Sequence, residues 1–149
     1  MKVLTLYTDG ACSGNPGEGG WCSILIYNGR EKKISGYSEK TTNNIMELTA
    51  VVEGLEMLKE SCIVNVYTDS KYIVDSVTKW LDNWVENGWR TSSKKPVKNI
   101  EFWQRIVRMT GIHDIRWNWV KGHDGDLYNE ECDKIAREEI LKHRENAVS

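Results

Sequence analysis

The fold is decided by residues 43–69, NNIMELTAVVEGLEMLKESCIVNVYTD, which join a helical pattern to a strand pattern. Apolar residues recur through 43–60 with a period of about 3.6, which predicts an amphipathic helix. They are Ile45, Leu48, Val52, Leu55 and Leu58. Residues 63–69, IVNVYTD, are rich in β-branched and aromatic side chains, as in a buried strand. A helix followed directly by such a strand indicates an α/β protein.

The amino-terminal side of this unit is rich in strand patterns. Residues 2–9 alternate loosely and predict a strand. Residues 10–20, GACSGNPGEGG, contain so much Gly, Ser, Asn and Pro that we predict a loop. Residues 21–38 predict a hairpin, because Asn28-Gly29 is a strong two-residue turn signal. This side of the chain therefore predicts an antiparallel meander of three strands.

The carboxyl-terminal side alternates helix and strand. Residues 70–88 predict a helix that ends at Gly88, and their pattern allows a break near Trp80. Beyond it we expect a Lys-rich loop over 89–99, a helix over 100–110, a strand over 114–120, a loop over 121–126 and a helix over 127–145. The order β-β-β-α-β-α-α-β-α predicts one mixed sheet with helices packed on its faces.

Composition indicates an ordinary globular protein. The 149 residues suit a single domain, 1–149, and 40% hydrophobic with 28% charged residues argues against disorder or a membrane span. The start, MKVLTLYTDG, has too short an apolar stretch for a signal peptide, so we expect a cytoplasmic protein. The four cysteines lack the spacing of a zinc site, which predicts reduced thiols.

Charge is unevenly distributed along the chain. The net charge is −2, yet residues 88–110 hold six basic side chains against Glu101 alone, a local charge of +5. A basic segment in an otherwise acidic chain suits a protein that binds a polyanion through one part and metal ions through another. A solvated charge run on a surface loop explains the same pattern.

Two carboxylates follow the same three-residue pattern at predicted strand ends. Asp9 closes the strand in LYTDG, and Asp69 closes another in VYTDS. Ligand sites of such sheets lie beyond the carboxyl ends of the strands, so two adjacent strands would place both side chains in one crevice. Alternatively, Asp9-Gly10 starts a turn and Asp69 or Ser70 caps the next helix.

Two further carboxylates lie early in predicted helices. Glu47 is in the first turn after Asn44, a spacing that also fits a capping box, and Asp133 could be a solvated helical charge. Clustered carboxylates require a compensating cation, and oxygen ligands without His or Cys favour Mg²⁺ or Mn²⁺. Two such ions suit phosphodiester cleavage. The sequence contains neither a P-loop nor a G-x-S-x-G nucleophile motif.

Five segments together resemble bacterial type 1 ribonuclease H, in the right order from residue 3 to about 140. They are YTDGACSGNPG (7–17), TTNNIMEL (41–48), YTDSKY (67–72), residues 80–104 with KKPVKN, and WVKGHDG (119–125). The resemblance implies the ribonuclease H-like α/β fold, a mixed five-stranded sheet of three antiparallel strands followed by parallel αβ units, flanked by helices.

The resemblance also implies an activity, namely endonucleolytic hydrolysis of the RNA strand of RNA·DNA hybrids by two Mg²⁺ ions, with Mn²⁺ as a substitute. The products carry 5′-phosphate and 3′-hydroxyl ends. Asp9 would contact both ions, Glu47 and Asp69 would act on the leaving-group side, and Asp133 on the water side. His123 corresponds to a mobile histidine that assists proton transfer or product release.

Substrate contacts are implied in the same way. On the RNA strand they are Cys12, Asn15, Asn43, Asn44 and Lys71, the last replacing the Gln usual in the family. On the DNA strand they are Trp80, Lys40, Thr42 and Asn99. A basic protrusion over about 80–99 adds Arg90, Lys94, Lys95 and Lys98, although Val85, Glu86 and Asn87 dilute its charge. We expect the other tryptophans Trp21, Trp103, Trp117 and Trp119 to pack in the core.

Other readings stay open at the level of sequence. A nuclease of the same fold could act on junction or transposon DNA, although such enzymes usually lack the Lys-rich protrusion. A catalytically silent hybrid-binding module is the non-enzymatic alternative. The partner expected under the first reading is an RNA·DNA hybrid, and nothing in the sequence predicts an oligomer or a membrane partner.

Overall fold

The computed structural model describes residues 1–121 and 126–148. Its strands are β1 (Lys2–Gly14), β2 (Gly17–Tyr27), β3 (Arg30–Thr41), β4 (Cys62–Thr68) and β5 (Asp114–Trp119). Its helices are α1 (Asn43–Glu56), α2 (Lys71–Asp75), the π-helical turn η1 (Ser76–Trp80), α3 (Leu81–Glu86), α4 (Ile100–Thr110) and α5 (Leu127–Val148). The element order matches the one predicted from the sequence.

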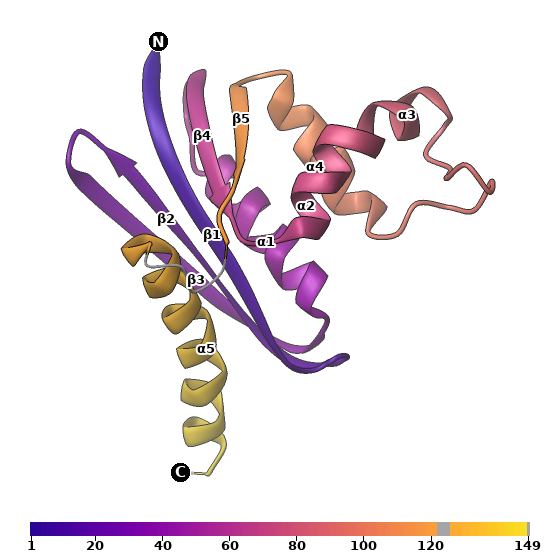
Figure 1. Cartoon of the computed structure of the whole chain (residues 1–149). Coiled ribbons are helices and arrows are strands. Elements are labelled where there is room, and N and C mark those ends of the chain that lie inside the picture. Colours follow the sequence, from indigo (N-terminus) through magenta and orange to yellow (C-terminus); the bar gives the residue numbers. More distant parts are fainter. Residues whose placement is uncertain (122–125, 149) are drawn as a thin grey trace.

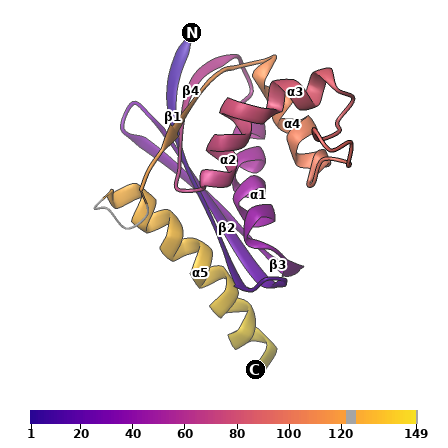
Figure 2. The same cartoon turned by 45° about the vertical axis from the view of Figure 1, so that its right-hand side comes forward.

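The five strands form one mixed sheet in the order β3-β2-β1-β4-β5 (Figure 1). β1 pairs antiparallel with β2, and β2 with β3, whereas β4 pairs parallel with both β1 and β5. α1 packs on β1 and β2 on one face of the sheet, and α5 packs on β1, β2 and β3 on the other (Figure 2). The predicted mixed sheet with helices on its faces is confirmed.

The main core lies between the sheet, α1 and α4. Leu6 and Val66 from the strands meet Leu48 and Val52 of α1 and the fully buried Trp103 of α4. A smaller cluster under α5 contains Cys22, Ile24, Cys132 and Ala136, which are also buried. The described cysteines are all free thiols, as predicted.

Residues 10–20 were predicted to be a loop, and that prediction is wrong. β1 continues to Gly14 and β2 begins at Gly17, with Gly10 paired to Trp21. The glycines there serve close packing. A Cβ at Gly10 would lie 2.5 Å from the backbone of α1 at Glu47, and one at Gly20 would lie 2.0 Å from the carbonyl oxygen of Ala136 in α5. Two helices thus approach these strands where side chains are missing.

Two predicted interruptions of regular structure are confirmed, whereas the helix predicted over 43–60 ends earlier, at Glu56. Asn28 and Gly29 both have positive φ, 50° and 75°, as a two-residue hairpin turn requires. The helical segment after Asp69 breaks at Trp80, whose φ of −121° lies outside the helical range. The chain therefore turns at Trp80 and starts α3, which leads into the basic protrusion.

Candidate active site

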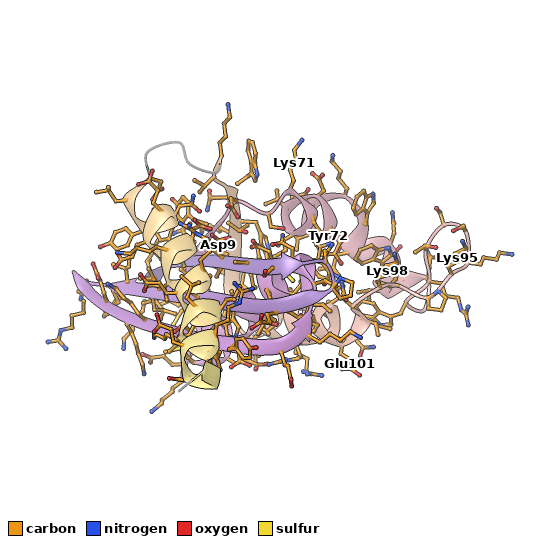
Figure 3. All side chains as sticks on the ribbon, turned by 90° about the horizontal axis from the view of Figure 1, so that it is seen from below. Asp9, Lys71, Tyr72, Lys95, Lys98 and Glu101 are labelled. Carbon is orange, nitrogen blue, oxygen red and sulfur yellow. The ribbon has the colours of Figure 1, made fainter. Side chains whose placement is uncertain are left out.

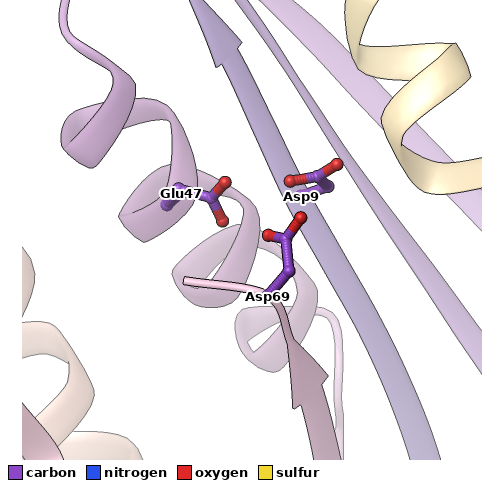
Figure 4. A group of neighbouring side chains, drawn as sticks. All are labelled: Asp9, Glu47 and Asp69. Carbon is purple, nitrogen blue, oxygen red and sulfur yellow. The ribbon is translucent and has the colours of Figure 1, made fainter. Parts of the chain in front are cut away.

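The parallel pairing of β1 and β4 aligns the two Y-T-D sequences. Tyr7 pairs with Tyr67 and Thr8 with Thr68, and the two tyrosine rings stack at 4.9 Å. Pairing with β4 stops at Thr8, so the aspartate that follows in each strand faces the same crevice (Figure 4). Asp9 was predicted to end its strand, and that prediction is wrong, because β1 continues beyond it in antiparallel pairing with β2.

The structure decides between the alternative roles of these aspartates. Asp9 is only 2% exposed and pairs with Cys22 in the middle of β1, so it starts no turn. Ser70 is the N-cap of α2, and its side chain accepts a hydrogen bond from the amide of Ile73 at 3.2 Å. The carboxylate of Asp69 is therefore not needed to cap this helix.

Glu47 is likewise not a capping residue. The N-cap of α1 is Thr42, whose Oγ1 accepts from the amide of Ile45 at 3.2 Å. Glu47 instead turns inward and is buried, and its Oε1 accepts from the backbone N–H of Gly10 at 3.1 Å. Because Gly10 lacks a Cβ, α1 comes close enough to β1 for this bond. The capping-box interpretation is wrong.

Asp9, Glu47 and Asp69 each offer an oxygen within 4.8 Å of the others (Figure 4). Burial raises the pKa of Asp9 far above its ordinary value, and the adjacent Glu47 carboxyl raises it further. Burial also raises the pKa of Glu47. A proton shared between Asp9 and Glu47 would form a hydrogen bond. When both are ionised, Asp9 Oδ2 and Glu47 Oε2 are buried without a donor among the described residues.

Asp133 completes what we call the acidic cluster, Asp9, Glu47, Asp69 and Asp133. It projects from α5 into the same pocket of about 320 Å³ that the other three line. Its Oδ2 accepts from Nε of Arg137 at 3.0 Å, one helical turn on. Asp133 is thus both a paired helical charge and a pocket residue. The sequence predicted all four positions, and the structure brings them together.

The residues expected on the RNA strand lie around the mouth of this pocket. Asn43, Asn44 and Lys71 line it directly. Asn15, in the β1–β2 turn, accepts the amide hydrogen of Asn43 through its side-chain oxygen at 3.1 Å. The thiol of Cys12 points instead toward the carbonyl oxygen of Thr41, at 3.4 Å. Four of these five residues are therefore pocket-lining or bonded to a lining residue.

The residues expected on the DNA strand come from three parts of the fold. Lys40 and Thr42 lie at the junction of β3 and α1, and α4 packs against α1. Asn99 is the N-cap of α4 in a left-handed conformation, with φ of 59°, and it donates to the Tyr72 hydroxyl at 3.2 Å. Trp80 is 44% exposed beside Trp84.

The basic protrusion is now defined by residues 81–99, α3 and the following loop. With Trp80 and Tyr72 it lines a groove of about 330 Å³, in which Lys95 and Lys98 take part. In the view of Figure 3, Tyr72 lies between Asp9 and Lys98. Arg105, counted in the basic segment, instead binds Glu56 through Nε at 3.0 Å. The charge available to a ligand is therefore smaller than the sequence predicts.

Four further residues have individual outcomes. His123 lies outside the described residues, so its role stays a prediction. Trp103 is fully buried, as predicted, whereas Trp119 is 47% exposed and the prediction that it packs in the core is wrong. Tyr72 was missed: it lines the acidic pocket, and its hydroxyl accepts from Asn99 and from the Trp103 indole. Its position one turn after Asp69 was the available signal.

Comparisons with known proteins identify the family of this chain. A family profile described as RNase H matches residues 1–141. Ribonuclease H of Acetivibrio thermocellus is 54% identical over 143 residues, which cover 95% of this chain and 97% of that protein. Ribonuclease H of Bradyrhizobium diazoefficiens is 52% identical over 97% of this chain and 94% of that protein.

Solved structures share the fold. LC9-RNase H1, described as a type 1 RNase H with the type 2 active-site motif, superposes with a TM-score of 0.83 at 30% identity, covering 95% of this chain and 73% of that chain. LC11-RNase H1, solved in complex with RNA/DNA hybrid, has a TM-score of 0.70 at 23% identity over 98% of this chain and 99% of that chain.

Proposed function

Since this chain belongs to the ribonuclease H family, we propose that the acidic cluster is the centre at which it hydrolyses the RNA strand of an RNA·DNA hybrid. The cleavage is endonucleolytic and leaves 5′-phosphate and 3′-hydroxyl ends. One observation carries the proposal, the meeting of Asp9, Glu47 and Asp69 within 4.8 Å. Like charges at this distance destabilise the fold unless a shared proton or bound cations compensate them, and such an arrangement is typical of reactive centres.

Divalent metal ions fit the residues present, as expected for this family. The donors are carboxylate oxygens alone, and two of them are buried without a hydrogen donor among the described residues. Such hard ligands favour Mg²⁺, with Mn²⁺ as a substitute. Two bound ions supply an activated water and stabilise the leaving oxygen. Asp9 would contact both, Glu47 and Asp69 would hold one, and Asp133 the other.

The surrounding residues orient these carboxylates. The N–H of Gly10 fixes one oxygen of Glu47 and leaves the other for a cation. Arg137 holds Oδ2 of Asp133 and leaves its second oxygen for another partner. Because Glu47 and Asp133 are each held through one oxygen, their remaining oxygens keep their positions before substrate arrives, which lowers the cost of reorganisation.

The mouth of the pocket supports recognition of the RNA strand. An RNA strand in a hybrid displays its 2′-hydroxyls in a wide, shallow minor groove, which separates it from DNA. Asn43 and Asn44 carry side chains that both donate and accept hydrogen bonds, as a hydroxyl requires. Asn15 holds the backbone of Asn43 in place, and Cys12 lies beside it on β1.

A second group of residues supports binding of the DNA strand. Thr42 accepts a hydrogen bond as the cap of α1, so its hydroxyl proton is free to donate to a phosphate. One amide hydrogen of Asn99 is engaged by Tyr72 and the other remains available. Lys40 supplies a charge beside Thr42. The exposed ring of Trp80 would lie against a deoxyribose, and the charges of Arg90, Lys94, Lys95 and Lys98 would follow the backbone.

The test is cleavage of four labelled substrates in Mg²⁺: RNA·DNA hybrid, duplex RNA, duplex DNA and a four-way junction. We expect cuts only in the RNA strand of the hybrid, with 3′-hydroxyl ends that a polymerase extends. Preferential cutting of the junction would support a resolvase of the same fold. Tight hybrid binding without cleavage would support a silent binding module. Either result contradicts the proposal.

The proposal includes the state of the protein. We expect a single domain over residues 1–149 that acts as a monomer in the cytoplasm. No helix within residues 1–121 and 126–148 is long and apolar enough to cross a membrane. Light scattering during size-exclusion chromatography, with and without hybrid, measures whether one chain binds one hybrid.

A further inference from the structure

Trp119 is a large exposed ring beside the active site with no role in the site described above. It is the last residue of β5 and pairs with Thr68, the residue before Asp69. Its indole Nε1 donates to the carbonyl oxygen of Asp69 at 3.3 Å, so the ring is tied to the end of β4. Almost half of the side chain remains exposed, at 47%. The fold therefore holds an aromatic surface at the rim of the acidic pocket.

The side chain of Lys71 contacts this aromatic surface. The ammonium of Lys71 lies 5.9 Å from the centroid of the Trp119 ring, a cation–π contact. Lys71 is the first residue of α2 and lines the acidic pocket together with Asp9, Glu47 and Asp69. Figure 3 shows Lys71 extending away from the ribbon, well separated from Lys95 and Lys98 of the protrusion. Its charge therefore borders the acidic pocket on the side of Asp69, whereas Arg137 pairs with Asp133 on the side of α5.

The position of this ammonium matters because its stem is flexible. A Lys side chain has four rotatable bonds and loses much conformational freedom when it binds a ligand. An unrestrained ammonium at this place would also be attracted to the carboxylates of the cluster, where it would compete with cations. The Trp119 ring attracts the Lys71 ammonium to the rim of the pocket and so holds it away from the carboxylates. The ammonium therefore stays available to a ligand that approaches from solvent.

We propose that Trp119 is a positioning residue that holds the Lys71 ammonium at the rim of the pocket, where it binds a phosphate of the RNA strand. This inference rests on the proposed function. Lys71 binds through charge, so it contributes to affinity in a salt-dependent way, unlike a neutral side chain that reads a hydroxyl. Trp119 acts through Lys71 and touches no reacting atom.

The experiment is hybrid binding without divalent ions, in EDTA, measured over a range of salt concentrations. The variants are Lys71→Gln, Trp119→Leu, the double variant and Trp119→Phe, with Lys32→Gln on the outer strand β3 as the matched control. Lys71→Gln should flatten the logarithmic salt slope by about 0.7 to 0.9, one phosphate contact. Trp119→Leu should weaken binding about two- to five-fold, the range of an exposed cation–π contact. Lys32→Gln should change neither.

The double variant separates positioning from a general structural role. If Trp119 acts through Lys71, Trp119→Leu should have no effect in the Lys71→Gln background, because the two effects are then not additive. Equal weakening in both backgrounds would overturn the proposal, as would a Lys71→Gln variant with unchanged affinity and salt slope. Trp119→Phe keeps an aromatic face and should lie between wild type and Trp119→Leu, which preserves the test if the Leu variant is unstable.

The proposed function can fail independently. Failure of the wild-type protein to cut the hybrid in Mg²⁺ contradicts that function whatever the binding of the variants. Normal cutting by the wild type, together with unchanged binding by Lys71→Gln, contradicts only the role of the Lys71–Trp119 pair.

Discussion

The acidic cluster and the basic protrusion carry opposite charges in opposite surroundings. Asp9 of β1 and Glu47 of α1 are almost completely buried where the helix packs on the five-stranded sheet, and two of their oxygens lack donors among the described residues. Lys94, Lys95 and Lys98 are exposed on a loop whose buried attachment to the core includes Val97. Burial makes the negative charges costly, whereas water and salt screen the positive ones.

This difference predicts that substitutions in the two regions affect different measurable quantities. Substitution in the acidic cluster should change the rate of the chemical step and the stability of the fold together, because the same buried charges determine both. Substitution in the protrusion should change only binding, because its contacts are equal in the ground and transition states.

Asp9→Asn should reduce kcat by about 10³-fold or more, because it removes a charge from the metal site while keeping the shape of the side chain. Hybrid binding in EDTA should survive, since it depends on other residues. Single-turnover cleavage and a binding titration measure the two separately. Asp114→Asn, at the exposed start of β5, is the matched control and should behave as wild type. Near-normal turnover by Asp9→Asn would contradict the assignment.

The same substitution should stabilise the protein without metal. The pKa of Asp9 in the folded protein lies far above its ordinary value of 3.8, which applies to the unfolded chain. At any pH between the unfolded-state pKa and the folded-state pKa, the folded state therefore binds more protons than the unfolded state. Stability without metal therefore falls as pH rises above about 4, and Asp9→Asn should remove part of that fall. We expect a gain of about 1–3 kcal/mol near pH 8 and little near pH 4.

Urea denaturation at several pH values in EDTA measures this gain. Saturating Mg²⁺ should stabilise the wild type more than the variant, because only the intact cluster binds the ion well. A gain in stability that does not depend on pH would mean that the buried charge of Asp9 does not destabilise the fold. The cluster and the protrusion would then not differ in the cost of their charges.

The sequence predicted the meeting of Asp9 and Asp69 because the determinants of this pair are local. The repeated Y-T-D places Asp9 and Asp69 at the same level of two parallel strands, whichever residues surround them. The amphipathic pattern predicted helix α1, but Glu47 was assigned to the site by resemblance, because its spacing from Asn44 fitted a capping box equally well. Asp133 was found by resemblance alone, since a single Asp in a long helix has no distinctive pattern.

The failed predictions depend on contacts between distant segments. Glycines at 10 and 20 indicate a loop in isolation, and only the approach of α1 and α5 explains them as strand residues. Arg105 counts as a free charge until α4 packs beside Glu56 of α1. Trp119 follows a core-like pattern, but it pairs with the last residue of β4, so little of the sheet extends beyond it to cover its ring.

Replacing Lys94, Lys95 and Lys98 together with Ala should raise KM about tenfold at moderate salt and leave kcat nearly unchanged. Each phosphate contact contributes about 0.9 to the logarithmic salt slope on B-DNA, so the slope should flatten by up to about 2.7. Steady-state kinetics over a salt series measure both. Lys2, Lys32 and Lys59, near the amino ends of β1, β3 and β4, form the control triple. An unchanged KM and slope would identify the protrusion as a solvated charge run.

The smallest effect on hybrid binding is expected at Glu86, where a negative charge reduces the positive charge of the protrusion. Glu86, the last residue of α3, is exposed and places a negative charge among the basic residues that follow it. Glu86→Lys changes the local charge by two units, so it should lower KM about two- to three-fold at low salt and steepen the salt slope by up to about 0.9. Glu86→Gln removes the repulsion alone and should give part of the gain in KM. Because these charges are exposed, both gains should vanish above about 0.5 M salt, where the screening length is only a few ångströms. A change in kcat, or a gain that persists in high salt, would mean that α3 reaches the acidic cluster and that the two regions are not separate.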